Sequence, residues 1–190
     1  MTEGRSQLEK LRELVSNRQK LAPVARLVDA HVEAVDPGRA RIRYAVKPEF
    51  MHPGKAVQGG IVTAYADMAM AMAAQTLCAE GEFLATSQLS ISFLLPVTRG
   101  PVFGEGTVVK RGRSTFFMEG VVKDGDGVEL ARATSVGTAR RTKPGYPTGS
   151  SRLIGFHHSR SLDDLTPRSP ALAAPGSHDR SCSFCSSCLS

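Results

Sequence analysis

Tryptophan is absent from the 190-residue chain, and aromatic residues make up only 6% of it. Surfaces that bind nucleic acids commonly stack bases on aromatic side chains, and the chain contains no recognised nucleic-acid-binding motif, so we expect no nucleic-acid partner. No run of about 18 apolar residues is free of polar interruption, which argues against a membrane-spanning helix. The N-terminus has no apolar segment of the kind found in signal peptides, and we therefore expect a cytoplasmic protein.

Cysteine is scarce, and three of the four cysteines lie together near the C-terminus. The fourth, Cys78, lies near the end of a long apolar segment and is expected to be a core residue. The spacing of Cys182, Cys185 and Cys188, with His178 close by, would suit a zinc site. No apolar pattern surrounds these residues to fold such a site, so we predict no metal centre.

The formal net charge is +6. Residues 141–190 carry six basic and three acidic side chains, so this segment accounts for +3 and the remainder of the chain for the other +3. A moderate positive charge is compatible with general solubility, and it also favours the binding of an anionic ligand. Both interpretations remain open at this point.

The hydrophobic pattern divides the chain into three parts. An amphipathic helix is predicted within residues 1–20, a folded domain over 21–141, and a Ser-, Pro- and Arg-rich tail over 142–190 whose composition is typical of disorder. The folded domain is expected to contain two strands, one long apolar helix and four more strands, at about 25–34, 40–47, 59–79, 83–95, 102–110, 114–123 and 128–139. This order is typical of an α+β fold in which an antiparallel sheet wraps around the long helix.

One acidic residue, Asp67, lies in the middle of the long apolar helix. Its neighbours for two turns on either side are apolar or small, so the helix is expected to be buried. A buried carboxylate without a partner is costly, and Asp67 is too far from the helix start to act as an N-cap. We therefore expect this carboxylate to be paired, neutral or facing a pocket.

A glycine pair, Gly59-Gly60, precedes Asp67 at the start of the same helix. The first backbone N–H groups of a helix are free to bind a negatively charged oxygen, and glycine lets a ligand approach the backbone closely. An acid together with such an oxyanion site is typical of acyl transfer.

These residues resemble the signature of the PaaI-type hotdog-fold acyl-CoA thioesterases. In that family a His-Gly-Gly triplet opens the central helix and an Asp follows nine residues after the His, and here Gln58-Gly59-Gly60 and Asp67 have the same spacing. Three later segments are similar to the family's second core strand, its basic glycine-containing turn and its last hairpin, namely residues 84–96, 110–114 and 126–133. The resemblance covers about residues 20–140 and implies a hotdog fold.

The resemblance implies that the chain hydrolyses acyl-CoA or related thioesters to the free acid and CoA. The Gly59 backbone N–H would stabilise the oxyanion, and Asp67 would act either as a general base or as a nucleophile. No metal or redox cofactor would be required, since CoA enters as part of the substrate. In this family the glycine and the acid of one site commonly come from different subunits, so a homodimer or homotetramer is expected.

Three further residues are candidates for the catalytic site. Gln58 replaces the family's His and would hydrogen-bond the loop before the helix. His52 stands where many relatives carry an Asn that contacts the thioester. Thr86 matches a strand position that in some relatives holds a Ser or Thr near the attacking water. Simpler interpretations are also open. Gln58 would then be a loop brace, His52 a solvated loop residue and Thr86 an ordinary strand residue.

Candidates for substrate binding lie in two segments. The turn Lys110-Arg111-Gly112-Arg113 could pair with the phosphates of CoA, or it could be a solvated hairpin turn. Gly60, at the helix start beside the expected substrate, is interpreted mainly as a steric requirement.

Two other functions are compatible with these residues. The first is a non-catalytic module that binds acyl-CoA as a sensor or to sequester it. The second is a purely structural oligomer in which Asp67 is hydrogen-bonded across a subunit interface. A binding module has little need for an acid beside an oxyanion site, so we favour the enzyme.

Overall fold

The computed structural model describes residues 7–17 and 21–141. The predicted tail over 142–190, with its three cysteines, lies outside these residues. Six strands form one antiparallel sheet in the order β1-β2-β4-β5-β6-β3. Their bounds are His31–Asp36 (β1), Arg39–Tyr44 (β2), Glu82–Phe93 (β3), Val102–Arg111 (β4), Thr115–Lys123 (β5) and Glu129–Arg141 (β6).

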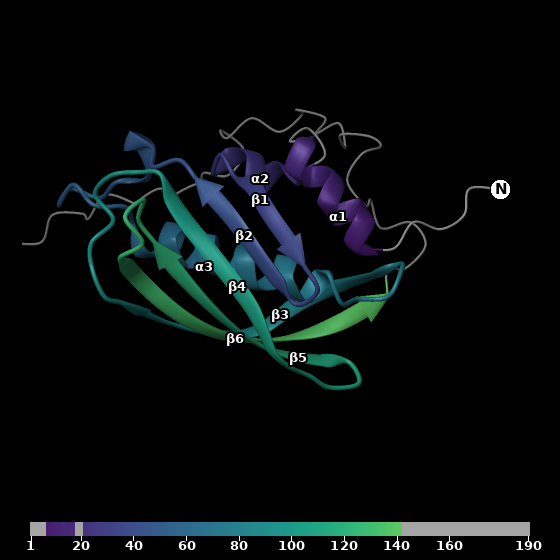
Figure 1. Ribbon diagram of the computed structural model, residues 1–190. Coiled ribbons are helices and arrows are strands. Elements are labelled where there is room, and N and C mark those ends of the chain that lie inside the picture. Colours follow the sequence, from purple (N-terminus) through teal and green to yellow (C-terminus); the bar gives the residue numbers. More distant parts are fainter. Residues whose placement is uncertain (1–6, 18–20, 142–190) are drawn as a thin grey trace, which may run out of the picture. The chain divides into compact units, whose positions relative to one another are not determined.

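Helix α3, Gly59–Gln75, lies across the inner side of this sheet, which curves around it (Figure 1). Its many alanines and methionines favour helix. Glycines on the facing strands let the helix approach closely. A Cβ built on Gly106 would lie 2.3 Å from the carbonyl oxygen of Ala69, and one built on Gly120 would lie 2.8 Å from Cγ of Met70. The predicted α+β class, an antiparallel sheet around a long central helix, is confirmed.

Two buried tyrosines tie the middle of α3 to β2. The rings of Tyr44 and Tyr65 stack with their centroids 4.4 Å apart, and the Tyr44 hydroxyl donates to the Tyr65 carbonyl oxygen at 3.0 Å. The Tyr65 hydroxyl donates to the carbonyl oxygen of Ala45 at 3.3 Å. Buried hydroxyls need such partners, so these bonds favour one rotation of α3 about its axis. That rotation turns Asp67 away from the core.

Two helices precede the sheet, α1 (Gln7–Ser16) and α2 (Pro23–Leu27). Helix α1 falls within the predicted segment 1–20. The predicted strand 25–34 is wrong in its first part, because Pro23 stands at the start of a helix, a position that proline favours. Strand β1 begins only at His31.

The long helix ends at Gln75, before the predicted end near residue 79, and Thr76 is its C-cap. The Thr76 hydroxyl accepts a hydrogen bond from the backbone N–H of Gly38 at 2.8 Å, in the turn between β1 and β2. This contact joins residues 38 positions apart, so the local pattern could not indicate it. Within residues 7–17 and 21–141, no helix is long and apolar enough to cross a bilayer.

Candidate active site

The start of α3 presents free backbone donors, as the glycine pair suggested. The carbonyl of the N-cap residue Gln58 accepts from Ile61 at 2.8 Å and from Val62 at 3.3 Å. The N–H groups of Gly59 and Gly60 come before these and have no acceptor within the helix. The helix dipole adds a partial positive charge at this end. This arrangement suits a developing oxyanion.

The two glycines have different surroundings. A Cβ built on Gly59 would lie 3.1 Å from Cζ of Phe93, whereas one built on Gly60 meets nothing within 4 Å. Within the described part of the chain, no neighbouring atom requires a glycine at position 60. Gly59 is the glycine with a close neighbour, because the ring of Phe93 lies against it.

Gln58 and His52 are both exposed in the loop that leads to α3. The Gln58 side chain makes no capping bond; its backbone N–H instead donates to the carbonyl oxygen of Phe50 at 2.8 Å. The loop is thus braced by the main chain of Gln58. Nδ1 of His52 accepts a hydrogen bond from the Gly54 N–H at 2.9 Å, so a neutral imidazole carries its proton on Nε2.

Asp67 lies on the partly exposed face of α3 that turns toward β3. The apolar sequence predicts a helix that is buried on all sides, whereas Asp67 itself is partly exposed. The Thr86 hydroxyl donates to Oδ1 of Asp67 at 2.9 Å, so the structure brings these two predicted site residues together. The carboxylate of Asp67 makes no other hydrogen bond within the described part of the chain, which leaves Oδ2 open.

Of the tyrosine pair, Tyr44 is influenced by the charge of Asp67. Burial raises the pKa of Tyr65 to about 12. Burial also raises the pKa of Tyr44 well above its ordinary value, and the neighbouring Tyr65 and the Asp67 carboxylate add to that rise. Both hydroxyls therefore remain protonated donors at neutral pH, beneath the helical turn that carries the acid.

The basic turn lies in the same cross-strand row as Thr86. Arg111 pairs with Phe116 across β4 and β5. Phe116 pairs with Gly137 of β6, and Gly137 in turn pairs with Thr86 of β3. Three strand spacings separate Thr86 from Arg111, which corresponds to about 14 Å. The turn is thus near the acid but not in contact with it.

The cations of this turn have no acidic partner among the described residues. This holds for Lys110, Arg111 and Arg113, while the Gly112 N–H closes the turn by donating to Thr115 at 2.7 Å. Strand β6 also brings Arg140 and Arg141 to this end of the sheet, opposite the start of β3. Sequence reasoning missed both, because the predicted strand ended at residue 139; their position directly after it was the available signal.

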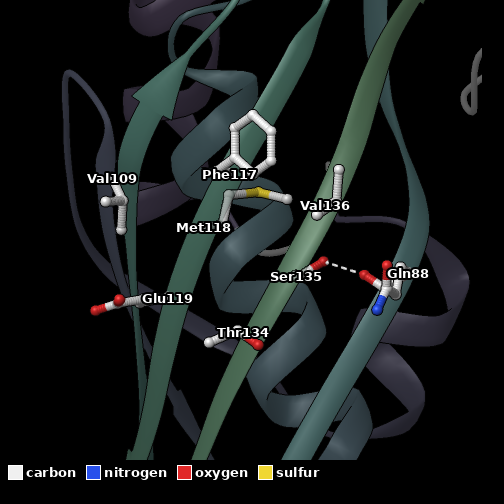
Figure 2. A pocket seen from close by; sticks show the side chains of 8 residues that line it. All are labelled: Gln88, Val109, Phe117, Met118, Glu119, Thr134, Ser135 and Val136. Atoms are coloured by element: carbon white, nitrogen blue, oxygen red, sulfur yellow. Dashed lines mark hydrogen bonds between the residues drawn. The ribbon is translucent and has the colours of Figure 1, made fainter.

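A shallow hollow lies on the outer face of the sheet, with α3 on the other side of the strands (Figure 2). It is lined by Gln88, Val109, Phe117, Met118, Glu119, Thr134, Ser135 and Val136. None of the predicted site residues is among them. The hollow is therefore separate from the candidate active site around Asp67 and Gly59.

Comparisons with known proteins agree with this geometry. Residues 54–131 match the family model of the thioesterase superfamily, a range that contains all the candidate catalytic residues except His52. SSO2140 of Saccharolobus solfataricus, named as a candidate esterase, is 31% identical over 125 residues, which cover 66% of this chain and 89% of that protein.

Two solved structures show the same fold. A phenylacetic acid degradation-related protein of Ralstonia eutropha is 28% identical, with a TM-score of 0.62, covering 70% of this chain and 99% of that one. The E. coli PaaI protein from the phenylacetic acid degradation operon is 18% identical, with a TM-score of 0.62, covering 73% of this chain and 97% of that one. The family match, the sequence relative and these structures together establish that this chain belongs to the thioesterase superfamily and has its hotdog fold.

Proposed function

We propose that this protein hydrolyses acyl-CoA thioesters to the free acid and CoA. The observation that carries the proposal is the carboxylate of Asp67. It is the charged group of a mostly apolar helix, is held by Thr86 through one oxygen, and keeps its other oxygen open. Membership of the thioesterase superfamily supports hydrolysis of a thioester as the reaction.

Asp67 is proposed to act as a general base or as a nucleophile. The hydrogen bond from Thr86 orients the carboxylate and leaves Oδ2 for the reaction. As a base, Asp67 takes a proton from water while the water oxygen attacks the thioester carbon. As a nucleophile, Oδ2 attacks that carbon itself, and water then cleaves the resulting anhydride. In both routes the carbon–sulfur bond breaks, and the departing CoA thiolate receives a proton.

The Gly59 N–H is proposed to hold the carbonyl oxygen as it becomes negative. Its position in the first turn of α3 supplies both a free donor and the positive end of the helix dipole. His52 is proposed to add a donor from the preceding loop, because its hydrogen bond with Gly54 places the proton of the neutral ring on Nε2. Gln58 is proposed to brace the loop through its main chain, and Gly60 to leave space beside the substrate.

One site is proposed to use residues from two subunits. Gly59 and Asp67 are eight residues apart in one helix, a distance of about 12 Å along its axis. A carbonyl bound at Gly59 is therefore too far from Asp67 of the same chain. Phe93, which lies against Gly59, and the following Leu94 and Leu95 are each about half exposed (54%, 51% and 49%), which supports a partner subunit on this side.

CoA is proposed to bind through the turn formed by Lys110, Arg111, Gly112 and Arg113. Its phosphates are separated from the thioester by the pantetheine arm, so a phosphate site must lie at some distance from the acid. The separation of about 14 Å between Thr86 and Arg111 fits that requirement. The absence of acidic partners for these cations among the described residues leaves their charge available to an anion.

The test is the release of free thiol from a panel of acyl-CoAs by the wild type and by Asp67→Ala. We expect turnover of at least one member, and a loss of roughly a hundredfold or more in Asp67→Ala. Asp126→Ala, which removes an exposed carboxylate from the β5–β6 turn, is the matched control and should keep wild-type turnover.

Two results would contradict the proposal. Turnover that survives in Asp67→Ala would move the chemistry to another residue. Binding of acyl-CoA without any turnover by the wild type would favour a sensor or sequestering module instead.

A further inference from the structure

The hydrogen bond between Thr86 and Asp67 joins an edge strand to the central helix, and Thr86 has little local support. Within the described part of the chain, β3 pairs with a strand on one side only, β6. The residue of β6 directly opposite Thr86 is Gly137, which has no side chain to contact it. An exposed threonine loses rotamer freedom when its hydroxyl is held in one place. The bond to Asp67 therefore depends on how closely the backbone of β3 is held.

The side chain of Gln75 holds β3 on one side of Thr86. Its Nε2 donates to the carbonyl oxygen of Glu82 at 2.7 Å, and its Oε1 accepts from the backbone N–H of Leu84 at 2.9 Å. One amide thus binds the strand at two points, as a peptide group of a neighbouring strand would. Leu84 lies two residues before Thr86, about 7 Å along the strand.

Gln75 also belongs to the helix that carries Asp67. The two residues are eight positions apart in α3, about 12 Å along its axis. The amide therefore ties the helix of the acid to the strand of its donor, and it resists sliding of one along the other. A slide of about 1 Å can stretch the 2.9 Å bond between Thr86 and Asp67 beyond the usual range of hydrogen bonds.

A bulge lies on the other side of Thr86. Thr86 and Gln88 pair with two adjacent residues of β6, so Ser87 is an extra residue in β3. A bulge locally disrupts the ladder of backbone hydrogen bonds. Here the hydroxyl of Ser135, on β6, donates to the Gln88 carbonyl oxygen at 2.9 Å (Figure 2). Ser135 is only 4% exposed, so this bond is shielded from water.

The bulge determines that Thr86 faces α3. Thr86 contacts Asp67, and Phe93 lies against the start of the helix, so both face α3 although they are an odd number of residues apart. A regular strand would turn one of them outward. Counting Ser87 as extra restores the alternation. The carbonyl that Ser135 holds therefore belongs to the stretch of backbone that directs Thr86 to the acid.

We propose that Gln75 and Ser135 are positioning residues for Asp67. They hold the backbone of β3 on either side of Thr86 and so keep its hydroxyl on the carboxylate. Each acts through Thr86 and not on the substrate. This inference rests on the role of Asp67 in the proposed function.

Gln75→Met tests the first of these holds. Methionine has a similar length but cannot replace the two bonds of the amide. The freed backbone groups of Glu82 and Leu84 can bind water, so we expect a folded protein. The kcat for the best acyl-CoA should fall about fivefold with KM nearly unchanged, because the orientation of Asp67 matters in the transition state. Glu80→Gln, an exposed change in the loop after α3, is the matched control and should keep wild-type kcat.

Ser135→Ala tests the second hold and should lower kcat by a similar factor. Thr134→Val is its matched control. It removes a hydroxyl from the neighbouring residue, which is exposed on the outer face of the sheet, and should leave kcat unchanged. Each hold is tested separately, so a variant that does not fold leaves the other decisive.

Double variants separate positioning from general support of the fold. In a Thr86→Val background no hydroxyl remains to be positioned. Gln75→Met and Ser135→Ala should then each lower kcat further by less than about twofold. Equal fold losses in the wild-type and valine backgrounds would overturn the proposal, since Gln75 and Ser135 would then not act through Thr86.

The mobility of the Thr86 methyl group gives a readout that needs no substrate. NMR relaxation of the full chain measures its order parameter. We expect a rigid methyl group in the wild type and in both controls, and an order parameter lower by about a third in Gln75→Met and Ser135→Ala. An inactive wild type with these order parameters would refute only the proposed reaction. An active enzyme whose Thr86 stays equally rigid in both variants would refute only this inference.

Discussion

The two faces of helix α3 use small residues for different reasons. On the face toward the sheet, helix and strands are so close that a Cβ on Gly106 would overlap the backbone at Ala69. On the face toward β3, a Cβ on Gly60 meets nothing within 4 Å, and the polar side chains of Asp67 and Gln75 reach the strand. The first face is complete within one chain. The second has open space and an open carboxylate oxygen, which is where a substrate and a second subunit are proposed to bind.

This contrast teaches how to interpret a small or polar residue in an apolar helix. Where the neighbouring strand also carries glycine, close packing explains the small residue, and a change should alter stability. Where the space beside it is empty or a polar group is only half paired, packing gives no explanation. A change there should alter activity while the fold is kept.

The largest effect on stability is expected for Gly106→Ala, which adds a methyl group between the sheet and α3. The added methyl group would lie 2.3 Å from a backbone oxygen, so the helix must move away from the strands. We expect the free energy of unfolding to fall by about 3 kcal/mol, measured by urea unfolding. A stability equal to that of the wild type would show that the close approach of α3 is not required.

Thr86→Val tests the other face of α3, which turns toward β3. Valine keeps the shape of threonine but cannot donate to Asp67, so the carboxylate loses the hydrogen bond that orients it. We expect kcat for the best acyl-CoA to fall about tenfold, with little change in stability since Thr86 is exposed. Thr86→Ser retains a hydroxyl and should recover most of the activity. Equal kcat values for the valine and serine variants would contradict the role of this hydroxyl.

Tyr65→Phe tests the face of α3 that packs on the sheet, through the pH dependence of stability. The pKa of Tyr65 is about 12 in the folded chain against an ordinary value of 10.0, so above pH 10 the unfolded chain loses this proton first. The contribution of this group to stability is therefore complete below pH 10 and declines as the pH rises toward 12. We expect the wild type to lose more stability than Tyr65→Phe between pH 9 and about 11.5 in urea unfolding. Equal losses in both proteins would contradict this account.

The smallest effect on stability is expected for Gly60→Ala, the counterpart of Gly106→Ala. The new methyl group meets no atom within 4 Å in the chain, so the free energy of unfolding should change by less than about 0.5 kcal/mol. KM for acyl-CoA should nevertheless rise, because the space beside the helix start is proposed to receive the substrate. A large loss of stability would show that the two faces do not differ as described.

Much of the fold followed from local pattern. The order of helices and strands was predicted except for the short 3-10 helix Pro48–Phe50 and for α2, which overlaps the first residues of the strand expected at 25–34. Turn residues such as Gly38, which has a φ of +73°, lie where the turns were expected. The spacing of Gly59 and Asp67 pointed to the candidate site, and the family match includes both residues.

Contacts between residues far apart in the chain could not be predicted from local sequence pattern. The bond of Gln75 with β3, the bulge at Ser87 and the position of Arg140 beside the basic turn all depend on how the strands pair. The exposure of Asp67 also differs from expectation, because a helix that is apolar in sequence can still have one side left uncovered by the sheet.

The amino-acid sequence by itself determined which residues form helices, strands and turns and which chemical groups are present. These properties arise from side-chain periodicity, backbone preferences and glycine or proline at single positions. Only the tertiary structure decided that Thr86 contacts Asp67 and that Phe93 lies against Gly59. It also decided that the Gln75 amide hydrogen-bonds the backbone of β3. Those contacts require strand register and the rotation of α3, which depend on packing among residues far apart in the chain.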